Sequence, residues 1–278
     1  AYLRPETAQG MFVNFLNYQN TIRHKIPFGI AQIGKSFRNE ITPGQFIFRT
    51  REFEQMEMEF FCRPEESVKF HEFWKNERYN WYIETLMIPK DKLRIRDHGK
   101  DELSHYSDAT SDIEFNFPWG WGELEGIAHR GDFDLTAHSK GSGKKLNTLD
   151  TESNTHFVPH VIEPAVGVDR ILFAILCSAY DVEEIADGEK RTLLHLPAAI
   201  AAVQIAILPL SKKEELKTIA QGIATVLRKS YRVEYDETQS IGKRYRRQDE
   251  IGTPYCITVD FDSLDDNSVT IRDRDTMK

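Results

Sequence analysis

The sequence predicts two domains, an α+β domain with an antiparallel sheet followed by a smaller α/β domain. In the first part, strand-like segments flank a Pro-Gly turn at 42–45, and such a turn favours an antiparallel pair. In the last part, strand-like and helix-like segments alternate, which is typical of a largely buried sheet. We place the domains at 1–192 and 193–278, because the polar tip at 187–190 (DGEK) is typical of a linker.

Hydrophobic periodicity predicts the elements of the first domain. Apolar residues three or four positions apart indicate a helix, and strict alternation of apolar and polar residues indicates a strand. Stretches rich in Gly and Ser indicate loops. The predicted elements are, in chain order, a helix over 11–24, a strand over 28–40, the turn at 42–45, a strand over 46–62, a helix over 65–88, a strand within 119–135, a loop over 139–156, a strand over 157–164 and a helix over 167–184.

The second domain is predicted in the same way. Its strand-like segments are short and apolar, so they fit the interior of a small sheet. The predicted elements are a strand over 203–210, a helix over 212–230, a strand over 231–236, a basic segment over 241–252, and strands over 255–261 and 268–274.

Composition and cysteine usage exclude several kinds of protein. Hydrophobic residues make up 40% of the 278 residues, which excludes a disordered chain. Because the net charge is −8, the protein would need a local basic patch in order to bind nucleic acid. Cys62, Cys177 and Cys256 are not at zinc spacing, so we expect reduced thiols in a cytoplasmic protein and no zinc. No apolar run approaches ~20 residues and no signal-like segment opens the chain, so we expect no membrane association.

Charged residues are sorted by sign along the predicted strand over 46–62. Cations lie at one end and carboxylates at the other, an arrangement that suits a ligand with a polyphosphate, a flat base and an ammonium group. Cross-strand ion pairs on a solvated face, each worth only ~0.2–1 kcal/mol, explain the charges equally well but not the sorting. Because alternate residues of a strand share a face, one face is expected to carry Arg49, Arg51, Phe53, Gln55, Glu57 and Glu59, and the core face Phe48, Met56, Met58, Phe60 and Cys62.

Several motifs resemble those of a known enzyme family. FR-x-E at 37–40, followed by R-x-x-x-F at 49–53, resembles motif 2 of the class II aminoacyl-tRNA synthetases, and GVDR at 167–170 resembles motif 3. The surrounding LRPETAQG, REFEQMEMEFF, RGDFDL and EPAVGVDR are similar to the dimeric glycyl-tRNA synthetases. IGKRYRRQDEIGTPYCITVD resembles the anticodon-binding domain of the glycyl, prolyl, threonyl and histidyl enzymes. The family's motif 1 precedes RPETAQG and is not in this sequence, so we expect a fragment.

The resemblance implies a class II catalytic domain that activates glycine with ATP. The motif 2 arginine of the family holds the α-phosphate and matches Arg38, whereas Arg170 would hold the γ-phosphate at a helix N-terminus that favours anions. Arg130 matches a family arginine near the reacting groups, so Arg38, Arg130 and Arg170 are the implied catalytic residues. The implied ATP-binding residues are Arg38, Asn39, Glu40, Phe48, Arg49, Thr50, Arg51, Glu52, Phe53, Glu123, Leu124, Gly167, Val168, Asp169 and Arg170.

The resemblance also implies a pocket for glycine. An apolar pocket rejects one extra methylene by only ~1–3 kcal/mol, so a tight pocket lined by carboxylates is a plausible solution. Glu6 and Glu57 match family residues that contact glycine. Ala165 stands where the family usually has serine, and Gly131 where it usually has threonine. The implied glycine-binding residues are Glu6, Phe53, Glu54, Gln55, Met56, Glu57, Glu163, Pro164, Ala165, Val166 and Gly167.

The implied partners are ATP, glycine, the glycine tRNA and a second copy of the chain. Carboxylates would hold Mg²⁺ at the phosphates, and Glu123 and Glu163 are the candidates. In the second domain, cations around an aromatic residue suit single-stranded RNA, although a solvated helix face paired with Asp249 and Glu250 is the plainer alternative. The implied tRNA-binding residues are Lys243, Arg244, Tyr245, Arg246 and Arg247.

Two other functions compete with the ligase. A synthetase-like protein can lose catalysis and serve only as a nucleic-acid-binding or accessory protein, but such a protein is expected to lose its ATP residues. A different class II synthetase is the second alternative. The threonyl enzyme is disfavoured because no zinc set is present, and the prolyl enzyme would need an apolar pocket in place of Glu6 and Glu57.

Overall fold

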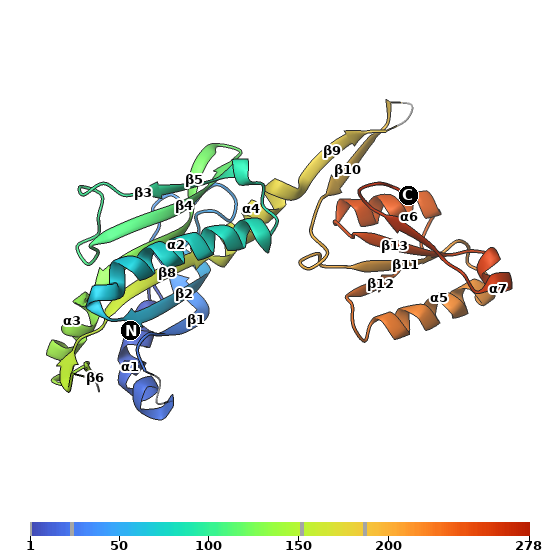
Figure 1. Cartoon of the computed structure of the whole chain (residues 1–278). Helices are drawn as coiled ribbons and strands as arrows, with labels where there is room; N and C mark the ends of the chain where they lie inside the picture. Colours follow the sequence, from blue (N-terminus) through green and yellow to red (C-terminus); the bar gives the residue numbers. More distant parts are fainter. Residues whose placement is uncertain (1, 23–24, 151–152, 186–187) are drawn as a thin grey trace. The chain divides into compact units, whose positions relative to one another are not determined.

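The computed structural model describes residues 2–22, 25–150, 153–185 and 188–278 (Figure 1). It divides into two compact units, Ala1–Ala174 and Ile175–Lys278. The two units are defined by how tightly the chain packs and not by function. The predicted boundary between the functional domains, at residues 192 and 193, therefore stays a prediction. The first residue of the predicted linker tip, residue 187, lies outside the described residues.

The first unit is built on a six-stranded sheet in which every strand pair is antiparallel. The α+β class predicted for this part is therefore confirmed. The strand order is β1-β2-β8-β5-β4-β3, so segments that are distant in the chain become neighbours. The strands are β1 (Phe28–Phe37), β2 (Glu52–Cys62), β3 (Leu93–Asp97), β4 (Ala109–Phe117), β5 (Gly120–Gly131) and β8 (His160–Gly167).

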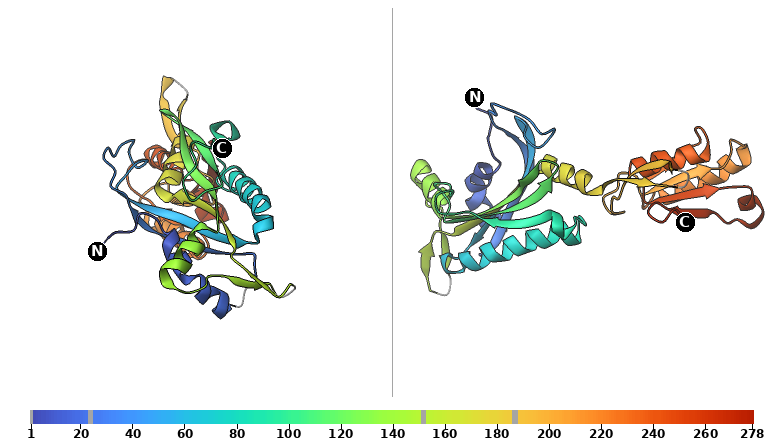
Figure 2. Two further views of the ribbon diagram at one scale, coloured as in Figure 1. Left: turned by 90° about the vertical axis from the view of Figure 1, so that its left-hand side faces the viewer. Right: turned by 90° about the horizontal axis from the view of Figure 1, so that it is seen from above.

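Helices cover both faces of this sheet (Figure 1, Figure 2). On one face, Phe61 of β2 packs against Phe12 and Phe15 of α1 (Ala8–Ile22). On the other face, the neighbouring Phe60 contacts aromatic rings of α2 (Ser67–Glu84). Successive strand residues point to opposite faces, so Phe60 and Phe61 anchor the two layers. The remaining helices of this part are η1 (Pro64–Glu66), η2 (Lys90–Lys92), α3 (Phe133–Ser142) and α4 (Val168–Ala179).

The connection between β1 and β2 differs from the predicted tight turn. The chain reverses at residues 45–48, inside an isolated bridge between Gly44 and Arg49, and Gln45 and Phe46 have positive φ angles of 58° and 55°. β2 consequently begins at Glu52 rather than at residue 46. Arg49 and Arg51 therefore lie in a loop and not on the strand.

The two faces of β2 have the opposite burial from the predicted one. Gln55, Glu57 and Glu59 are 6%, 4% and 0% exposed, whereas Met56 and Met58 are only half-buried. The expected core face is thus the less buried of the two. The acids are buried because they face the interior of the first unit, where other polar groups meet them.

Two short hairpins were missed. β6 (Thr148–Asp150) pairs with β7 (Thr155–Phe157) inside the predicted loop. The predicted helix over 167–184 ends at residue 179, where the chain continues as β9 (Tyr180–Glu184) and pairs with β10 (Lys190–Leu194). The helical apolar spacing of α4 stops at the same place, because charged residues follow Tyr180.

The second unit has the predicted α/β fold, a four-stranded sheet of order β12-β11-β13-β14. β11 pairs in parallel with β12 and β13, and only β14 is antiparallel. Ile207 of β11 packs on the α5 side, and Ala206 and Leu208 pack on the α6 side, so β11 is buried on both faces. The elements are β11 (Ile205–Pro209), α5 (Glu214–Leu227), β12 (Val233–Tyr235), α6 (Ile241–Glu250), β13 (Tyr255–Val259), α7 (Asp262–Asp266) and β14 (Thr270–Asp273).

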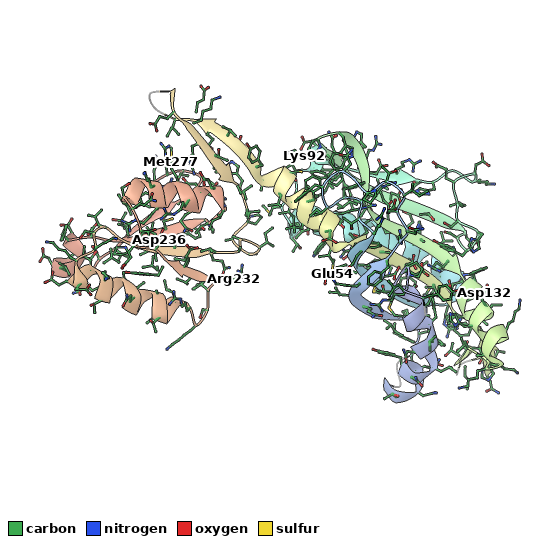
Figure 3. All side chains as sticks on the ribbon, turned by 180° about the vertical axis from the view of Figure 1, so that it is seen from behind. Glu54, Lys92, Asp132, Arg232, Asp236 and Met277 are labelled. Atoms are coloured by element: carbon green, nitrogen blue, oxygen red, sulfur yellow. The ribbon has the colours of Figure 1, made fainter. Side chains whose placement is uncertain are left out.

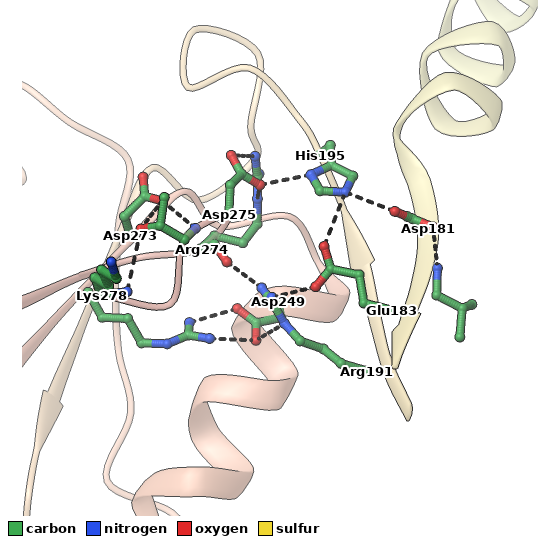
Figure 4. A network of polar contacts seen from close by, with 12 residues as sticks. Asp181, Glu183, Arg191, His195, Asp249, Asp273, Arg274, Asp275 and Lys278 are labelled. Atoms are coloured by element: carbon green, nitrogen blue, oxygen red, sulfur yellow. Dashed lines mark hydrogen bonds and ion pairs between the residues drawn. The ribbon is translucent and has the colours of Figure 1, made fainter. Parts of the chain in front are cut away.

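A polar network ties the β9–β10 hairpin into the second unit (Figure 4). Arg191 donates hydrogen bonds to Asp249 of α6 at 2.9 Å and to Glu183 at 2.9 Å. His195 lies between Asp275, at 2.8 Å, and Asp181, at 3.3 Å.

Across the described ranges, no helix combines the length and apolar character needed to cross a membrane.

Candidate active site

A cavity of about 290 Å³ lies on the face of the six-stranded sheet that also carries α1. Its floor is made of alternate residues from four strands, and its walls come from the β1–β2 loop, residues 98–106 and the start of α4. The floor residues are Phe53, Gln55 and Glu57 of β2, Glu163, Ala165 and Gly167 of β8, Gly126 and Ala128 of β5, and Thr110 and Asp112 of β4.

Arginines meet at one end of this cavity. The Arg38 guanidinium lies 5.3 Å from the centre of the Phe53 ring, and its Nε donates to the carbonyl of Pro5 at 3.2 Å. Arg49 lies 3.7 Å from the Glu40 carboxylate. Each arginine lines the cavity, so this end attracts anions.

Arg170 completes the cationic end from the first turn of α4. Its guanidinium donates to the carbonyl oxygens of Phe48 at 3.1 Å and Glu123 at 2.9 Å, and it stacks on the Phe48 ring at 4.2 Å. These contacts fix the side chain toward the β1–β2 loop. The helix N-terminus adds a favourable partial charge for an anion.

The other end of the cavity is acidic. Glu57 accepts hydrogen bonds from the Thr7 amide at 2.9 Å and from Gln55 Nε2 at 3.0 Å, and also from the Thr7 hydroxyl. Glu163 accepts a hydrogen bond from Arg130, which is also paired with Asp134 at 2.7 Å. Both glutamates are therefore held in position before any ligand binds.

The acidic end is electrostatically strained. Burial raises the pKa of Glu57, and the nearby Glu6 raises it further. Burial also raises the pKa of Glu163, in competition with Arg130, which favours the charged form. Burial alone would lower the pKa of Arg130. The neighbouring Glu163 and Asp134 outweigh the effect of burial, so the pKa of Arg130 is raised. A cationic ligand group placed beside these acids would favour their charged forms and would itself be stabilised.

Strand register gives this end a floor of small residues. Ala165 pairs with Glu57 on one side and with Gly126 on the other, and Glu163 pairs with Ala128. Beside the two acids, the neighbouring residues of the sheet therefore carry only a methyl group or a hydrogen atom as their side chain. The arrangement can accept a small molecule with an ammonium group.

Comparison with known families decides how this cavity is understood. Residues 1–179 match the family model described as "tRNA synthetase class II core domain (G, H, P, S and T)", which is more than half of the chain. The chain belongs to the class II aminoacyl-tRNA synthetases. Residues 204–278 match the model described as "Anticodon binding domain".

Individual relatives of this chain are glycine–tRNA ligases. The glycine–tRNA ligase of Ruminiclostridium cellulolyticum is 63% identical over 277 residues, and that of Acetivibrio thermocellus is 61% identical over 277 residues. Both alignments cover 100% of this chain and 59% of the relative, so the chain spans about 59% of the length of the curated relatives it matches.

A solved structure supports the class II fold. The prolyl-tRNA synthetase of Cryptosporidium parvum, complexed with L-proline and AMP, superposes with a TM-score of 0.72 at 21% identity. The match covers 99% of this chain and 56% of that chain. At this identity the likeness concerns the fold alone.

In this class II synthetase, most of the residues implied by the resemblance line one cavity. The β1–β2 loop, three strands, the start of α4 and Glu6 before α1 bring them together. Those that line it are Glu6, Arg38, Glu40, Phe48, Arg49, Thr50, Phe53, Gln55, Glu57, Glu123, Glu163, Ala165, Val166, Gly167, Asp169 and Arg170.

Other implied residues do not line this cavity, for physical reasons. Arg51 donates to the carbonyl of Glu40, and Glu52 pairs with Lys35 on the neighbouring strand. Glu54 is exposed, and its amide donates to Asp169 at 3.2 Å (Figure 3). The full set is Asn39, Arg51, Glu52, Glu54, Met56, Leu124, Arg130, Pro164 and Val168.

Several residues that line the cavity were missed by sequence reasoning. Thr110 and Asp112 lie on alternate positions of β4, and this alternation was a usable sign of a strand. Nothing local indicates that β4 lies in the same sheet as β2. The missed residues are Ile47, His98, Glu102, Ser104, Tyr106, Thr110, Asp112, Gly126 and Ala128.

Only one of the two candidate magnesium ligands suits the ion. Glu123 is half-exposed at the arginine end, 3.4 Å from Arg170. Glu163 is buried and already bonded to Arg130, whereas Mg²⁺ keeps several waters and loses them reluctantly. We therefore retain Glu123 and withdraw Glu163. Among the described residues, Asp181, Glu183 and His195 form another, partly exposed group of possible metal ligands.

The basic segment of the second unit forms α6, and the helix divides its cations between two sides. Arg244 is 2% exposed and donates to the carbonyl oxygens of Pro209 at 2.6 Å and Asp236 at 3.2 Å. Tyr245 packs on the sheet, and its hydroxyl is bonded to Thr258. The predicted contacts of Arg244 and Tyr245 with RNA do not fit this placement.

Three cations of α6 remain accessible to a ligand. Lys243 and Arg246 are exposed, and Arg246 is paired with Glu189. Arg247 is half-buried and bonded to Asp236. The candidate RNA surface on this helix therefore consists of Lys243, Arg246 and Arg247.

Proposed function

We propose that this chain is the catalytic and tRNA-binding part of a glycine–tRNA ligase. The observation that carries the proposal is a single cavity with arginines at one end and buried glutamates at the other, in a class II core. The identity of 63% to a glycine–tRNA ligase supports the same substrate.

ATP would bind at the arginine end. Arg38 and Arg170 would contact the triphosphate, as their counterparts do in the resembling family, and Arg49 would reach its terminal phosphate. Phe53 lines the cavity and would stack on the adenine, and Glu40, which lies beside Arg49, would meet the base. Preorganised cations of this kind stabilise the charge that develops in the transition state.

Glycine would bind at the acidic end. Its ammonium group would lie between Glu57, Glu163 and Glu6, over the small residues Ala165 and Gly126. Arg130 is a positioning residue in this scheme, because it is buried behind Glu163 and orients that carboxylate. A larger amino acid would have to displace these fixed groups.

The reaction needs no enzyme nucleophile. A carboxylate oxygen of glycine forms a bond to the α-phosphorus of ATP, the bond from that phosphorus to the bridging oxygen breaks, and pyrophosphate leaves with the electron pair. The enzyme supplies orientation and charge neutralisation. A terminal hydroxyl of tRNA then attacks the carbonyl carbon of glycyl-adenylate, and AMP leaves.

Magnesium is the expected metal of this site. Glu123 would hold it beside Arg170, and the ion would neutralise charge on the phosphates when bound. We further propose a cytoplasmic homodimer, on the resemblance alone. No feature of the cavity favours a catalytically silent protein, since the residues expected for ATP are kept.

The test is amino-acid-dependent exchange of pyrophosphate into ATP. Glycine alone should support exchange, and Arg38→Ala should lower the rate at least about 10²-fold, the usual effect of removing one preorganised donor. Arg94→Ala is the control, because Arg94 lies on the edge strand β3 and does not line the cavity. Exchange with a different amino acid would overturn the substrate, and full activity of Arg38→Ala would overturn the phosphate site.

A further inference from the structure

Glu59 lies beneath the acidic end of the cavity and has no evident role in binding ATP or glycine. It is two residues beyond Glu57 on the same face of β2, and it does not line the cavity. One carboxylate oxygen from each of Glu57, Glu59 and Glu163 lies within 4.8 Å of the others. Glu59 is therefore the deepest member of a group of three buried acids.

Glu59 is fully buried, and no N–H or hydroxyl donor among the described residues reaches either of its carboxylate oxygens. The other two acids are satisfied, because Thr7 and Gln55 donate to Glu57 and Arg130 donates to Glu163. An ionised carboxylate without a partner in the interior is very unfavourable. A neutral carboxyl group avoids this cost and gains one O–H donor.

The surroundings favour the neutral form. Arg130 is shared between Glu163 and Asp134, so it does not supply a hydrogen bond to Glu59. Burial raises the pKa of Glu59 well above its usual value, and the charges of Glu163 and Glu57 raise it further. Carboxylate oxygens of those two residues lie within 4.8 Å of Glu59, and a hydrogen bond with Glu163 contributes to the raised pKa.

We propose that Glu59 is a positioning residue for the ammonium site, a neutral carboxyl group whose hydrogen bond to Glu163 holds that carboxylate against Arg130. The proposal rests on the proposed function, because the ammonium group is that of glycine. A carboxylic acid in this place positions Glu163 without adding a third charge. The site then presents Glu57 and Glu163 to one small cation.

The first test separates the hydrogen bond from the charge. Glu59→Gln keeps the shape and an N–H donor, so the KM for glycine in pyrophosphate exchange should stay within about 3-fold of the wild type. Glu59→Leu keeps the volume but removes the donor, so the KM for glycine should rise at least about 10-fold, as expected for a lost bond to a charged group. The KM for ATP should not change in either variant.

The second test does not depend on activity. Glu59→Gln should leave the free energy of unfolding unchanged or higher, and it should remove the contribution of Glu59 from the infrared band that protonated carboxyl groups are expected to give in the wild type at neutral pH. Glu125→Gln is the matched control, because Glu125 is a buried glutamate of the same sheet that accepts hydrogen bonds from Arg78 and Tyr82. That variant should be less stable and should keep the band.

The outcomes distinguish the two proposals. Absence of glycine-dependent exchange in the wild type would remove the proposed function but not the neutral state of Glu59, which the infrared band and the unfolding measurement test. Equal loss in Glu59→Gln and Glu59→Leu, or a wild type without the band, would overturn the role of Glu59. If Glu59→Leu fails to fold, the glutamine variant and the band still decide.

Discussion

Buried arginines illustrate how single residues are used for different purposes in the two units. Arg130 is held by two carboxylates, so its charge is balanced and it orients Glu163. Arg244 instead donates to backbone carbonyl oxygens at the end of β11, and burial lowers the pKa of its guanidinium. The same residue type therefore supports a binding site in one unit and closes a strand end in the other.

Arg244→Ala should destabilise the second unit. The change leaves the carbonyl oxygens of Pro209 and Asp236 without a donor in the interior, which costs roughly 2–4 kcal/mol in the free energy of unfolding. Hydrogen exchange of peptides from β11 and β13, read by mass spectrometry, would measure the loss of protection.

Lys243→Ala provides the control for this substitution. Lys243 is the exposed neighbour on the same helix, so its loss should change stability by less than about 0.5 kcal/mol. Equal exchange protection in the two variants would contradict the structural role of Arg244.

Among the elements, α2 brings titratable groups into the interior of the first unit. Nε2 of His71 on α2 donates a hydrogen bond to the carbonyl oxygen of Ile127 at 3.1 Å, because a carbonyl oxygen can only accept. His129 of β5 lies near His71 and near His160 of β8. Burial lowers the pKa of His71 and of His129. The interface between α2 and the sheet is therefore built for neutral imidazoles.

His71 and His129 should lower the stability of the first unit as the pH drops below about 6.5. The buried acids with raised pKa values act in the opposite direction, so the histidine contribution is read from variants. At the two histidines, the unfolded chain takes up protons near that pH, whereas the folded chain takes them up only at lower pH. Their contribution to stability is complete above the unfolded pKa and decreases below it, by up to about 1.4 kcal/mol per pH unit for each proton. Urea unfolding between pH 7.5 and 5, followed by tryptophan fluorescence, measures this unit, because Trp74, Trp81, Trp119 and Trp121 all belong to it.

His71→Gln should remove up to one proton from the pH dependence that the two histidines contribute. The glutamine amide can still donate to the Ile127 carbonyl, but it does not titrate. His156→Gln is the control, because His156 is exposed. An unchanged slope in His71→Gln would rule out His71 as a source of the effect.

At the scale of the whole molecule, the two units are suited to separate tasks. The cavity lies entirely in the first unit, whereas Lys243 and Arg246 are on a helix of the second. Binding of tRNA and activation of glycine should therefore be separable by mutation, if the proposed function holds.

Lys243→Ala with Arg246→Ala should weaken tRNA charging and spare pyrophosphate exchange. Losing two phosphate contacts on a single strand should flatten the slope of log K against log salt by about 1.4. Titration of tRNA at several salt concentrations measures the slope, and charging kinetics measure its consequence.

The matched control removes one arginine and one lysine next to the other large helix of this unit, α5. Arg228→Ala with Lys229→Ala alters residues just beyond α5, which covers the opposite face of the sheet from α6. This variant should bind tRNA like the wild type. A loss of exchange in the α6 variant would show that the two tasks are not separable.

What the sequence by itself determined is the family, the two fold classes and most of the residues around the cavity. Motifs such as FRNE and GVDR are short and continuous, and helix or strand periodicity depends on near neighbours. Arg38, Arg170 and Phe53 could therefore be named without coordinates.

Only the tertiary structure decided which side chains are buried and what they meet. The acids of β2 are interior because β8 pairs beside them and β5 and β4 extend the sheet, and Glu59 receives no hydrogen bond from Arg130 because Arg130 is used elsewhere. Arg244 and Arg246 are two positions apart, yet only the packing of α6 on its sheet turns one inward. Such outcomes depend on contacts between distant segments, and local sequence patterns carry no information about those contacts.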